Sequence, residues 1–519
     1  MASNREIATR KQPQTRKRRW LARLAAIAFG ISLLAGFEGL CRLCNWGRPE
    51  LQDDPFVGFR AIRPLFVLSE DGKRYEISKP RQTHFRPQSF AAQKADNEYR
   101  VFCLGGSTVQ GRPYAVETSF TTWLELSLHA ADPSRRWRVV NCGGISYSTY
   151  RLTPILEEVL HYEPDLVIIC EGHNEFLESR SFAHIQDRGE LFNASLAAVS
   201  RLHTYSLLRG AYARLRGWPS NAAPAGRPIL PVEVEALLDY RGGLEEYHRD
   251  EAWRANVIRQ FRYNLLRMVQ LARGAGVDVI LINPPSNIGD VPPFKAEHSP
   301  ELTSEELVRW EGLLESARDH FRGEKRNLRA AIAKLEEACR IDPLHAGGWY
   351  TLAECYRSVG RMAEARDAYL QAKELDVCPL RILQPMNQAI LDVARETDTP
   401  LVDAERLFEQ NSPHGIVGSD QLVDHVHPSF EGHQRIADAL AERLIELGVV
   451  RPASDWQAKK KIAFQKQLDN LDNYYYLEGE RRLKNLRLWA RGRAKRIRPT
   501  PSSSAQEPAA DSAQLRGLR

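Results

Sequence analysis

A serine that follows two glycines is the first residue of the chain that could do chemistry. It stands in the stretch Val101–Gly111, VFCLGGSTVQG, where an apolar segment runs straight into Gly105, Gly106 and Ser107. An apolar strand that ends in two glycines predicts a tight turn. Open α/β sheets place their chemistry at the carboxyl ends of such strands. Ser107 is therefore a candidate nucleophile, and the competing interpretation is a serine that caps the following helix.

A serine hydroxyl needs a base, and the best candidate lies far along the chain in Asp424-His-Val-His427-Pro428. Serine nucleophiles are activated by a histidine that a carboxylate orients. Asp424 and His427 are three residues apart, so their side chains can meet within one turn. Two alternatives stay open: His425 and His427 as a metal pair, which lacks a third ligand at a recognisable spacing, and a loop with incidental histidines.

Acyl transfer also needs hydrogen-bond donors for the oxyanion that forms during the reaction. Two other predicted strand ends supply candidates. Residues 141–147 form a turn with Gly144 and Ser146, whose backbone N–H groups could serve, and residues 171–176 offer the side-chain amide of Asn174. Each signal is weak alone, because Asn and Gly are ordinary turn residues. Matching parts at several strand ends favour Ser107 as a nucleophile.

Strand and helix patterns alternate through the middle of the chain. Apolar segments predict strands at Arg100–Leu104, Trp137–Asn141, Asp165–Cys170, Gly276–Asn283 and Pro400–Asp403. Helical patterns cover Tyr114–Ala131, Tyr150–Leu160, much of Phe176–Gly276, and Phe430–Leu447. This alternation predicts a parallel sheet with right-handed crossovers, which brings the candidate residues to one sheet edge.

A long insertion separates the last two predicted strands, and it is too long for a loop in a compact domain. Its spacing matches a tetratricopeptide repeat at Trp349, Leu352, Ala353, Tyr356, Gly360, Ala365, Tyr369 and Ala372, with Ala331, Leu335, Ala338 and Pro343 as part of a preceding repeat. The alternative is an ordinary helical hairpin. One and a half repeats are too few to stand alone, so the unit must lean on the sheet domain or on a protein partner.

Basic residues precede an apolar run near the N-terminus. Arg16–Arg19 is followed by the run from Leu24 to Phe37, which Glu38 interrupts. This order predicts a single-pass signal anchor over residues 20–43, with residues 1–19 in the cytoplasm and the catalytic domain on the extracytoplasmic, periplasmic side. No small-residue cleavage site follows the run. A cleaved signal peptide and a buried soluble helix are the alternatives.

Charge is unevenly spread over the 519 residues. The net charge is +6, but both ends are basic and the middle is mildly acidic. That distribution argues against a nucleic-acid enzyme with a basic groove and fits basic tails near an anionic membrane. The eight cysteines show no zinc-type pairing, and no metal or organic cofactor is expected.

The chain changes character after Val450. Residues 451–497 predict a basic helical tail, by default a solvated charged helix, with membrane-surface or partner contact as the alternative. Residues 498–519 are rich in Pro, Ser and Ala and predict disorder.

Three short blocks follow one another along the chain: Gly105-Gly-Ser-Thr108 with Gly111, then Gly172-His-Asn174-Glu, then Asp424-x-x-His427-Pro. In these blocks the chain resembles the SGNH (GDSL-like) hydrolases, in a membrane-anchored form with an inserted tetratricopeptide unit. The resemblance covers roughly residues 97–176, 276–290 and 400–448. It implies a flavodoxin-like three-layer α/β/α sandwich with a parallel sheet, and hydrolysis or transfer of O-acyl esters.

The resemblance also implies roles for single residues. Ser107 would be the nucleophile, His427 the general base and Asp424 its orienter, with Asn174 and the N–H of Ser107 as oxyanion donors. Two departures matter. The first block reads Gly-Gly-Ser-Thr rather than Gly-Asp-Ser-Leu. The family also has a block between the first two that normally ends in a glycine; counted from Asn141, that glycine falls on Ser146, with Gly144 out of register.

These patterns predict one order of segments: a basic cytoplasmic tail (1–19), a signal anchor (20–43), an extended lead-in (44–96), a hydrolase domain in two parts (97–300 and 379–450) around a helical insertion (301–378), a basic helical tail (451–497) and a disordered tail (498–519). The expected activity is an extracytoplasmic serine esterase acting on O-acylated carbohydrate or another ester. The alternatives are an O-acyltransferase acting on cell-envelope polysaccharide and a degenerate hydrolase that serves as a scaffold. The expected partners are the membrane and a protein at the insertion, with no nucleic acid.

Overall fold

The computed structural model describes residues 16–44, 46, 64–177, 202–205, 207–208, 243–322 and 326–490. The chain divides into two compact units, residues 1–62 with 181–230 and residues 63–180 with 231–519. The predicted disordered tail and most of Phe176–Gly276 before residue 243 lie outside the described residues.

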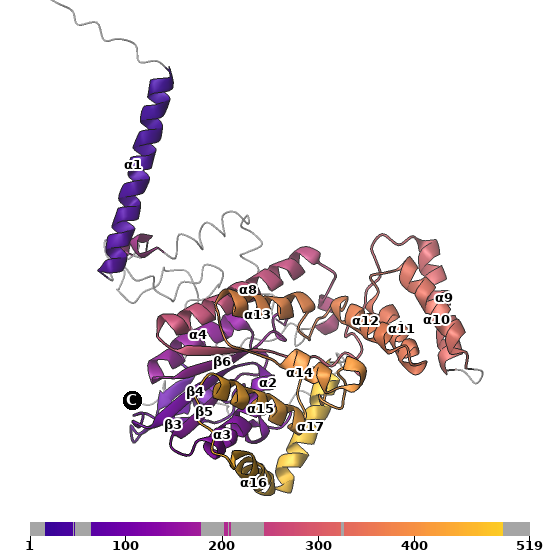
Figure 1. Cartoon of the computed structure of the whole chain (residues 1–519). Coiled ribbons are helices and arrows are strands. Elements are labelled where there is room, and N and C mark those ends of the chain that lie inside the picture. The colour runs from indigo at the N-terminus through magenta and orange to yellow at the C-terminus, as the bar shows by residue number, and fades with distance from the viewer. Residues whose placement is uncertain are drawn as a thin grey trace, which may run out of the picture. The chain divides into compact units, whose positions relative to one another are not determined.

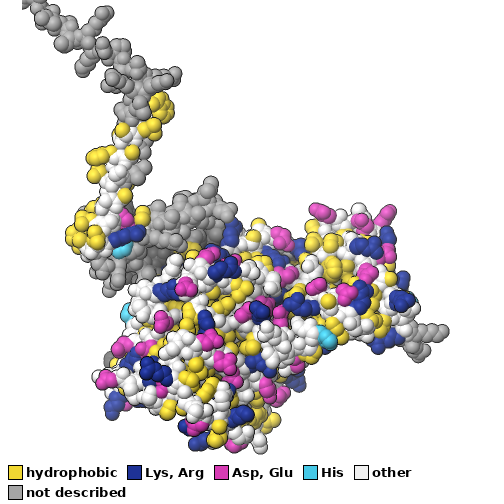
Figure 2. Space-filling model, in the orientation of Figure 1, with side chains coloured by type: hydrophobic (Ala, Val, Ile, Leu, Met, Phe, Trp, Pro, Cys, Tyr) yellow, Lys and Arg dark blue, Asp and Glu magenta, His cyan; other side chains and the backbone are white. Residues whose placement is uncertain are grey.

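The first unit contains helix α1, Arg16–Leu43 (Figure 1). Its segment Arg23–Leu43 is long and apolar enough to cross a membrane, with a mean hydropathy of 1.9. Hydrophobic side chains line it (Figure 2), and Phe29 is 67% exposed. The carboxylate of Glu38, which interrupts the apolar run, accepts hydrogen bonds from Arg42 Nε at 2.8 Å and from Thr204 N at 2.9 Å. The apolar helix matches the predicted anchor in length and composition, while its orientation stays a prediction.

A five-stranded sheet is the centre of the second unit. Its strands are β4 (Glu98–Gly105), β5 (Arg136–Gly143), β6 (Leu166–Cys170), β7 (Asp278–Asn283) and β8 (Leu401–Asp403). All neighbours pair in parallel, in the order β5-β4-β6-β7-β8. Counted along the chain this is the flavodoxin order, 2-1-3-4-5. The predicted parallel sheet is confirmed, with strand ends that move by a few residues.

Helices cover both faces of this sheet (Figure 1). One face carries α4 (Thr149–Val159), α8 (Glu251–Gly274) and α13 (Gln384–Glu396), and the other carries α3 (Phe120–Ala131), α15 (Phe430–Glu446) and α16 (Trp456–Asp469). Apolar side chains from the sheet and from the second helix layer, such as Trp123, Ile168 and Leu440, are fully buried together. The arrangement has three layers, helix, sheet and helix.

Short elements complete the domain. A small antiparallel sheet precedes the main one, with β1 (Phe66–Leu68), β2 (Arg74–Ile77) and β3 (Ser89–Ala91). The others are α2 (Ser107–Gln110), α14 (Ala404–Gln410) and the 3-10 turns η1 (Lys79–Arg81), η2 (Val116–Thr118), η3 (Leu160–Tyr162), η5 (Gly243–Glu246) and η6 (Pro413–Gly415). The small sheet packs on the main one, because the Phe90 ring lies 5.3 Å from that of Phe102.

The predicted helix over Tyr114–Ala131 is wrong at its start. Residues 116–118 form the separate turn η2, and α3 begins only at Phe120. Ser119 is extended and its hydroxyl accepts a hydrogen bond from Thr121 N, which caps α3. The apolar pattern predicted one helix, but the capping residue Ser119 separates the turn η2 from the helix α3.

The insertion consists of four consecutive helices, α9 (Ser304–Arg322), α10 (Leu328–Ile341), α11 (Ala346–Ser358) and α12 (Met362–Glu374). Each helix packs on the next. They share a hydrophobic core in which Ala331, Leu335 and Leu352 are buried, and Ile288 and Ile416 of the sheet domain belong to the same core. Most of the spaced residues are thus core residues of a helical unit, whereas Pro343 and Gly360 are exposed. The assignment of this unit as a tetratricopeptide repeat stays a prediction.

The C-terminal helices are not the solvated tail that the charge pattern favoured. Phe464 of α16 is only 9% exposed and its ring centroid lies 4.7 Å from that of Trp123. On α17 (Asn473–Ala490), the Tyr475 hydroxyl lies 2.8 Å from Thr118 Oγ1, and Arg487 donates to the carbonyl of Val423 at 2.6 Å. Both helices therefore belong to the sheet domain, because they pack against segments of that domain.

Candidate active site

Ser107 opens helix α2 directly after strand β4, at the carboxyl edge of the sheet. Glycine is required at the two positions before it, because neighbouring atoms approach the backbone too closely to leave room for a side chain. A side chain at Gly105 would lie 2.1 Å from the carbonyl oxygen of Cys170, and one at Gly106 would lie 2.3 Å from Asn174 Nδ2. The first N–H groups of a helix have no partner within the helix. The turn therefore brings Asn174 next to Ser107 and leaves the Ser107 N–H available to a ligand.

The structure brings together the two predicted partners that are farthest apart in the sequence. Ser107 Oγ lies 2.7 Å from Nε2 of His427, although 320 residues separate them. The other ring nitrogen, Nδ1, lies 2.7 Å from Oδ2 of Asp424. A carboxylate only accepts, so this contact assigns the ring proton to Nδ1 and the lone pair to Nε2. A neutral imidazole held in this way can take the proton of the hydroxyl.

Asp424 is bound tightly within its own loop. Its Oδ1 accepts the N–H groups of Val426 and His427, both at 2.9 Å. The loop is closed by a hydrogen bond of 2.8 Å from Val423 N to His427 O. Burial alone would raise the pKa of Asp424, but the charges of His427 and His425 and these hydrogen bonds outweigh it and hold the pKa well below its ordinary value. Asp424 is therefore ionised at neutral pH.

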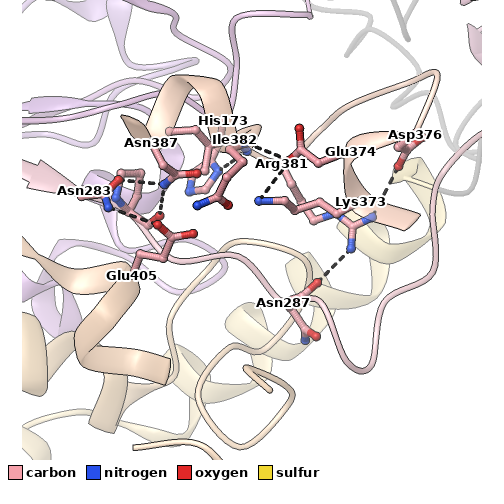
Figure 3. Close-up of polar contacts among 12 residues, drawn as sticks. His173, Asn283, Asn287, Lys373, Glu374, Asp376, Arg381, Ile382, Asn387 and Glu405 are labelled. Carbon is pink, nitrogen blue, oxygen red and sulfur yellow. Dashed lines mark hydrogen bonds and ion pairs between the residues drawn. The ribbon is translucent and has the colours of Figure 1, made fainter. Parts of the chain in front are cut away.

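A residue that the sequence analysis missed holds this loop from behind. Asn287 donates from Nδ2 to the carbonyl of Asp424 at 3.0 Å, and its N–H donates to the carbonyl of His425 at 3.0 Å. Arg381 donates in turn to the carbonyl of Asn287 at 2.9 Å and lies 3.4 Å from Oδ2 of the buried Asp376 (Figure 3). Arg381 follows the helical insertion in the chain. The segment that follows the insertion thus supports the Asp424 loop through Asn287.

The same returning segment also holds the turn that carries Asn174. The N–H of Ile382 donates to Nδ1 of His173 at 3.1 Å (Figure 3). Asn174 itself donates from Nδ2 to the carbonyl of Tyr147 at 2.9 Å and to Oε1 of Glu171 at 3.2 Å. These bonds fix the orientation of the amide, so its nitrogen faces the nucleophile turn.

Gly144 and Ser146 differ in what their N–H groups can do. The Gly144 N–H donates to the carbonyl of Gly105 at 2.9 Å, so Gly144 is not available as an oxyanion donor. Ser146 has a left-handed backbone, with a φ of 59°. Glycine favours that region, which is consistent with the glycine expected at this register. Of the two predicted positions, Ser146 therefore remains as the candidate oxyanion donor.

Two buried glutamates lie beneath Asn174. Burial, together with the charge of Glu175, raises the pKa of Glu171 to about 8, against which the hydrogen bonds from Gly172 and Asn174 act only in part. Burial raises the pKa of Glu175 to about 7, although Thr149 donates to it from both N and Oγ1. Glu171 is therefore mostly protonated at neutral pH and braces Asn174 as a neutral group.

The other histidine of the Asp424 loop, His425, is a buried residue that packs against an aromatic ring. His425 is buried with its ring centroid 5.1 Å from that of Phe294. Burial lowers its pKa to about 4, even though Asp424 acts in the opposite direction. In the described part of the chain, no group of three or more His, Cys, Asp or Glu residues is arranged to hold a metal ion. The geometry therefore gives the paired-histidine alternative no third ligand among those residues.

No family model matches the sequence, and no curated protein matches it either. Among solved structures, the chain is similar to a lipase/acylhydrolase from Enterococcus faecalis, with a TM-score of 0.30, 13% identity, and coverage of 69% of this chain and 99% of the other. It is also similar to an acetylxylan esterase from Geobacillus stearothermophilus, with a TM-score of 0.29, 13% identity, and coverage of 68% and 96%. A third is a putative lipolytic protein of the G-D-S-L family from Desulfitobacterium hafniense, with a TM-score of 0.29, 12% identity, and coverage of 66% and 99%. At these low scores, the similarity does not indicate a function for this chain.

Proposed function

We propose that the chain is a membrane-anchored serine esterase of the SGNH type that hydrolyses O-acyl esters outside the cytoplasm. One observation carries the proposal: the Ser107 hydroxyl lies 2.7 Å from a histidine nitrogen whose partner nitrogen lies 2.7 Å from a buried carboxylate. A hydroxyl, an imidazole and a carboxylate in this order are the parts that nucleophilic acyl transfer requires.

The proposed reaction has two steps. His427 Nε2 takes the proton of Ser107 as Oγ attacks the ester carbonyl, and the protonated ring then gives that proton to the leaving alcohol. Water attacks the acyl-enzyme in the second step, with His427 again as the base, and Ser107 is released. Asp424 holds the ring in the right tautomer and stabilises its positive charge. The N–H groups of Ser107 and Ser146 and the Asn174 amide are the proposed oxyanion donors. The two N–H groups of the amide donate to Tyr147 and Glu171, so one of these bonds must give way when Asn174 binds the oxyanion.

The location of the domain is part of the proposal. Basic residues precede α1, and the positive-inside rule then puts the N-terminus in the cytoplasm and the sheet domain outside. Alkaline phosphatase fused after residue 519 should be active in cells, because that enzyme needs an oxidising compartment to form its disulfides. An inactive fusion in fully expressed protein would reverse the orientation.

Replacement of the two reacting residues tests the activity. Ser107→Ala and His427→Ala should each abolish turnover of 4-nitrophenyl acetate by the detergent-solubilised full chain. His129→Ala, which removes an exposed histidine of α3, is the matched control and should keep wild-type turnover. A fluorophosphonate label should attach to Ser107 in the wild type, as found by mass spectrometry. Full activity of Ser107→Ala would end the proposal.

A further inference from the structure

Three arginines lie on segments that are bonded to the nucleophile turn, to its neighbours or to the Asp424 loop, and the reaction as proposed does not use them. The first is Arg112, which directly follows the nucleophile turn. Its backbone N–H donates to the carbonyl of Ser107 at 3.1 Å. This bond fixes Arg112 to the residue that would attack the ester.

Arg86 approaches the same turn from the lead-in segment. Two residues before it, the carbonyl of His84 accepts a hydrogen bond from Gln110 Nε2 at 2.7 Å and another from Ile145 N at 2.9 Å. Gln110 ends helix α2, which Ser107 begins, and Ile145 precedes Ser146. The segment that carries Arg86 is therefore bonded to both the nucleophile turn and the turn with the proposed backbone donor.

Helix α17 adds a third arginine and contacts the chain on both sides of the site. Arg482 donates from Nη1 to the carbonyl of Tyr114 at 3.0 Å, two residues after Arg112. Arg487 of the same helix donates to the carbonyl of Val423, next to Asp424, at 2.6 Å. The helix runs from the Ser107 side of the site to the Asp424 side. Its basic residues are thus placed at the site rather than on a free tail.

The charges of these guanidinium groups lie close enough to affect one another's pKa values. Burial and the charge of Arg482 lower the pKa of Arg86, against a weaker opposing effect of Glu117, Tyr475 and Glu478. Burial and the charges of Arg86 and Arg482 lower the pKa of Arg112 to about 10, although Asp424 acts in the opposite direction. Each arginine of the pair Arg86 and Arg112 is therefore repelled by cationic neighbours.

The pair also lacks acceptors. Among the residues that the structure describes, no carboxylate forms an ion pair with Arg86 or Arg112, and the Nε atoms of both are buried without a hydrogen-bond partner. Arg482 differs, because Glu478 lies 3.7 Å from its Nη2. Desolvated cations that lack a counter-charge cost stability. The planar guanidinium fork can donate to two oxygens of a carboxylate or a phosphate at once.

We propose that Arg86 and Arg112, reinforced by Arg482, bind an oxyanion group, a carboxylate or a phosphate, that the ester substrate carries close to its scissile bond. This inference rests on the proposed function and narrows its substrate to acidic esters. An acylated acidic sugar has the required chemistry, as does a phosphorylated acyl ester, and the experiment separates these two sources.

Three acetate esters of one shape test the proposal: 4-acetoxybenzoate, 4-acetoxyphenyl phosphate and the neutral 4-acetoxybenzamide. The measured quantity is the ratio of kcat/KM for each anionic ester to that for the neutral ester. In the wild type we expect a ratio above ten for one of the two anions, and the larger ratio identifies carboxylate or phosphate as the preferred group. In Arg86→Gln and in Arg112→Gln that ratio should fall at least fivefold. Equal losses on charged and neutral esters would overturn the proposal, because they would make these arginines supports of the catalytic residues.

Three further variants serve as controls for this test. Arg481→Gln removes a neighbouring arginine of α17 whose side chain is 72% exposed and lies 3.2 Å from Glu478, and it should leave the ratio unchanged. Arg86→Lys keeps the charge and should retain more of the preference than Arg86→Gln. A preference for anions that survives in the Arg86→Gln, Arg112→Gln double variant would also overturn the proposal.

A binding measurement separates this inference from the proposed function. In the Ser107→Ala protein, calorimetric titration should give a Kd for 4-acetoxybenzoate or 4-acetoxyphenyl phosphate at least tenfold below that for 4-acetoxybenzamide. Arg112→Gln in the same background should remove the difference. If the wild type hydrolyses no ester but this preference is found, the esterase proposal fails and the anion site stands. If the wild type hydrolyses all three esters alike and no preference is found, the anion site fails and the esterase stands.

Discussion

Buried carboxylates flank Ser107 on two sides: Asp424 on the histidine side, and Glu171 with Glu175 beside Asn174. All three are at most 5% exposed, yet their pKa values move in opposite directions. Asp424 has two histidines and two backbone N–H donors, and its pKa is held low. Glu171 has amide donors and an acidic neighbour, and its pKa rises to about 8.

The difference shows that burial alone does not decide ionisation. What decides it is whether the surrounding groups favour the charged form strongly enough to offset desolvation. Around Asp424 they do, so the site has a fixed negative charge where a protonated His427 would need one. Around Glu171 they do not, so Asn174 is held by a neutral acceptor that does not oppose a forming oxyanion.

The largest effect on activity is expected from removing the charge of Asp424. Asp424→Asn removes the charge and lets His427 take the wrong tautomer, so kcat should fall about 10,000-fold. KM for 4-nitrophenyl acetate should change little. Asp420→Asn, an exposed acid of the same loop region, is the control and should keep its turnover. An Asp424→Asn enzyme with near wild-type kcat would refute the role of the carboxylate.

On the neutral side, Asn174→Ala removes a proposed oxyanion donor while the Glu171 and Glu175 pair remains. Loss of one such donor lowers kcat about 100-fold to 1,000-fold. Steady-state kinetics measure the effect, and the rate of fluorophosphonate labelling of Ser107 should fall with it. Unchanged kcat would show that Asn174 is only a structural contact of Tyr147.

Much of this site was predictable because its signals are local. The apolar run that ends in Gly-Gly-Ser marks the end of strand β4, and the Asp-x-x-His loop follows β8 after the short helix α14. Parallel topology then brings both segments to the same edge of the sheet. The meeting of Ser107 with His427 follows from that topology, even though the helical insertion lies between them in the sequence. The choice between Gly144 and Ser146 did not follow, because it depends on which N–H already has a backbone acceptor.

Other parts could not be predicted because their contacts lack a periodic pattern. Helix α17 packs through a tyrosine hydroxyl and arginine guanidinium groups that bond to distant backbone carbonyls. The helix also buries Leu483 and Leu486, but two leucines in a charged segment form too short an apolar pattern to predict where the helix packs. The sequence does not indicate the roles of Asn287 and Arg381 either. An asparagine in a Pro-rich loop and an arginine after a helix are common in many structural settings.

A smaller effect is expected from the support behind Asp424. Asn287→Ala removes the side-chain hydrogen bond to the Asp424 carbonyl without touching a reacting atom, so kcat should fall about tenfold, the scale of one lost hydrogen bond. KM should stay near the wild-type value, because the substrate does not contact Asn287. Asn411→Ala, at an exposed position, is the control. A loss of folded protein with no change in kcat per active site, counted by fluorophosphonate labelling, would reduce Asn287 to a purely structural role.

The smallest effect on activity is expected from Glu171→Gln, which replaces a mostly neutral acid by its neutral analogue. At pH 7 kcat should stay within about threefold of the wild type. The effect on stability should instead depend on pH. The folded pKa of about 8 lies above the ordinary 4.5, so between these values the folded chain holds a proton that the unfolded chain has lost. The free energy of unfolding should therefore fall as pH rises, by up to about 1.4 kcal/mol per pH unit for this group.

Urea unfolding of the solubilised chain at pH 5 and pH 8, followed by tryptophan fluorescence, measures this slope. The wild type should lose more stability than Glu171→Gln between the two pH values, and Glu297→Gln, which removes an acid whose pKa is lowered, should not flatten the slope. Asp424 cannot supply the same behaviour, because a depressed pKa adds stability that is lost only in acid, as pH falls below its ordinary value of 3.8. Equal slopes in the wild type and Glu171→Gln would mean that Glu171 is ionised in the folded chain, and the contrast between the two sides of Ser107 would disappear.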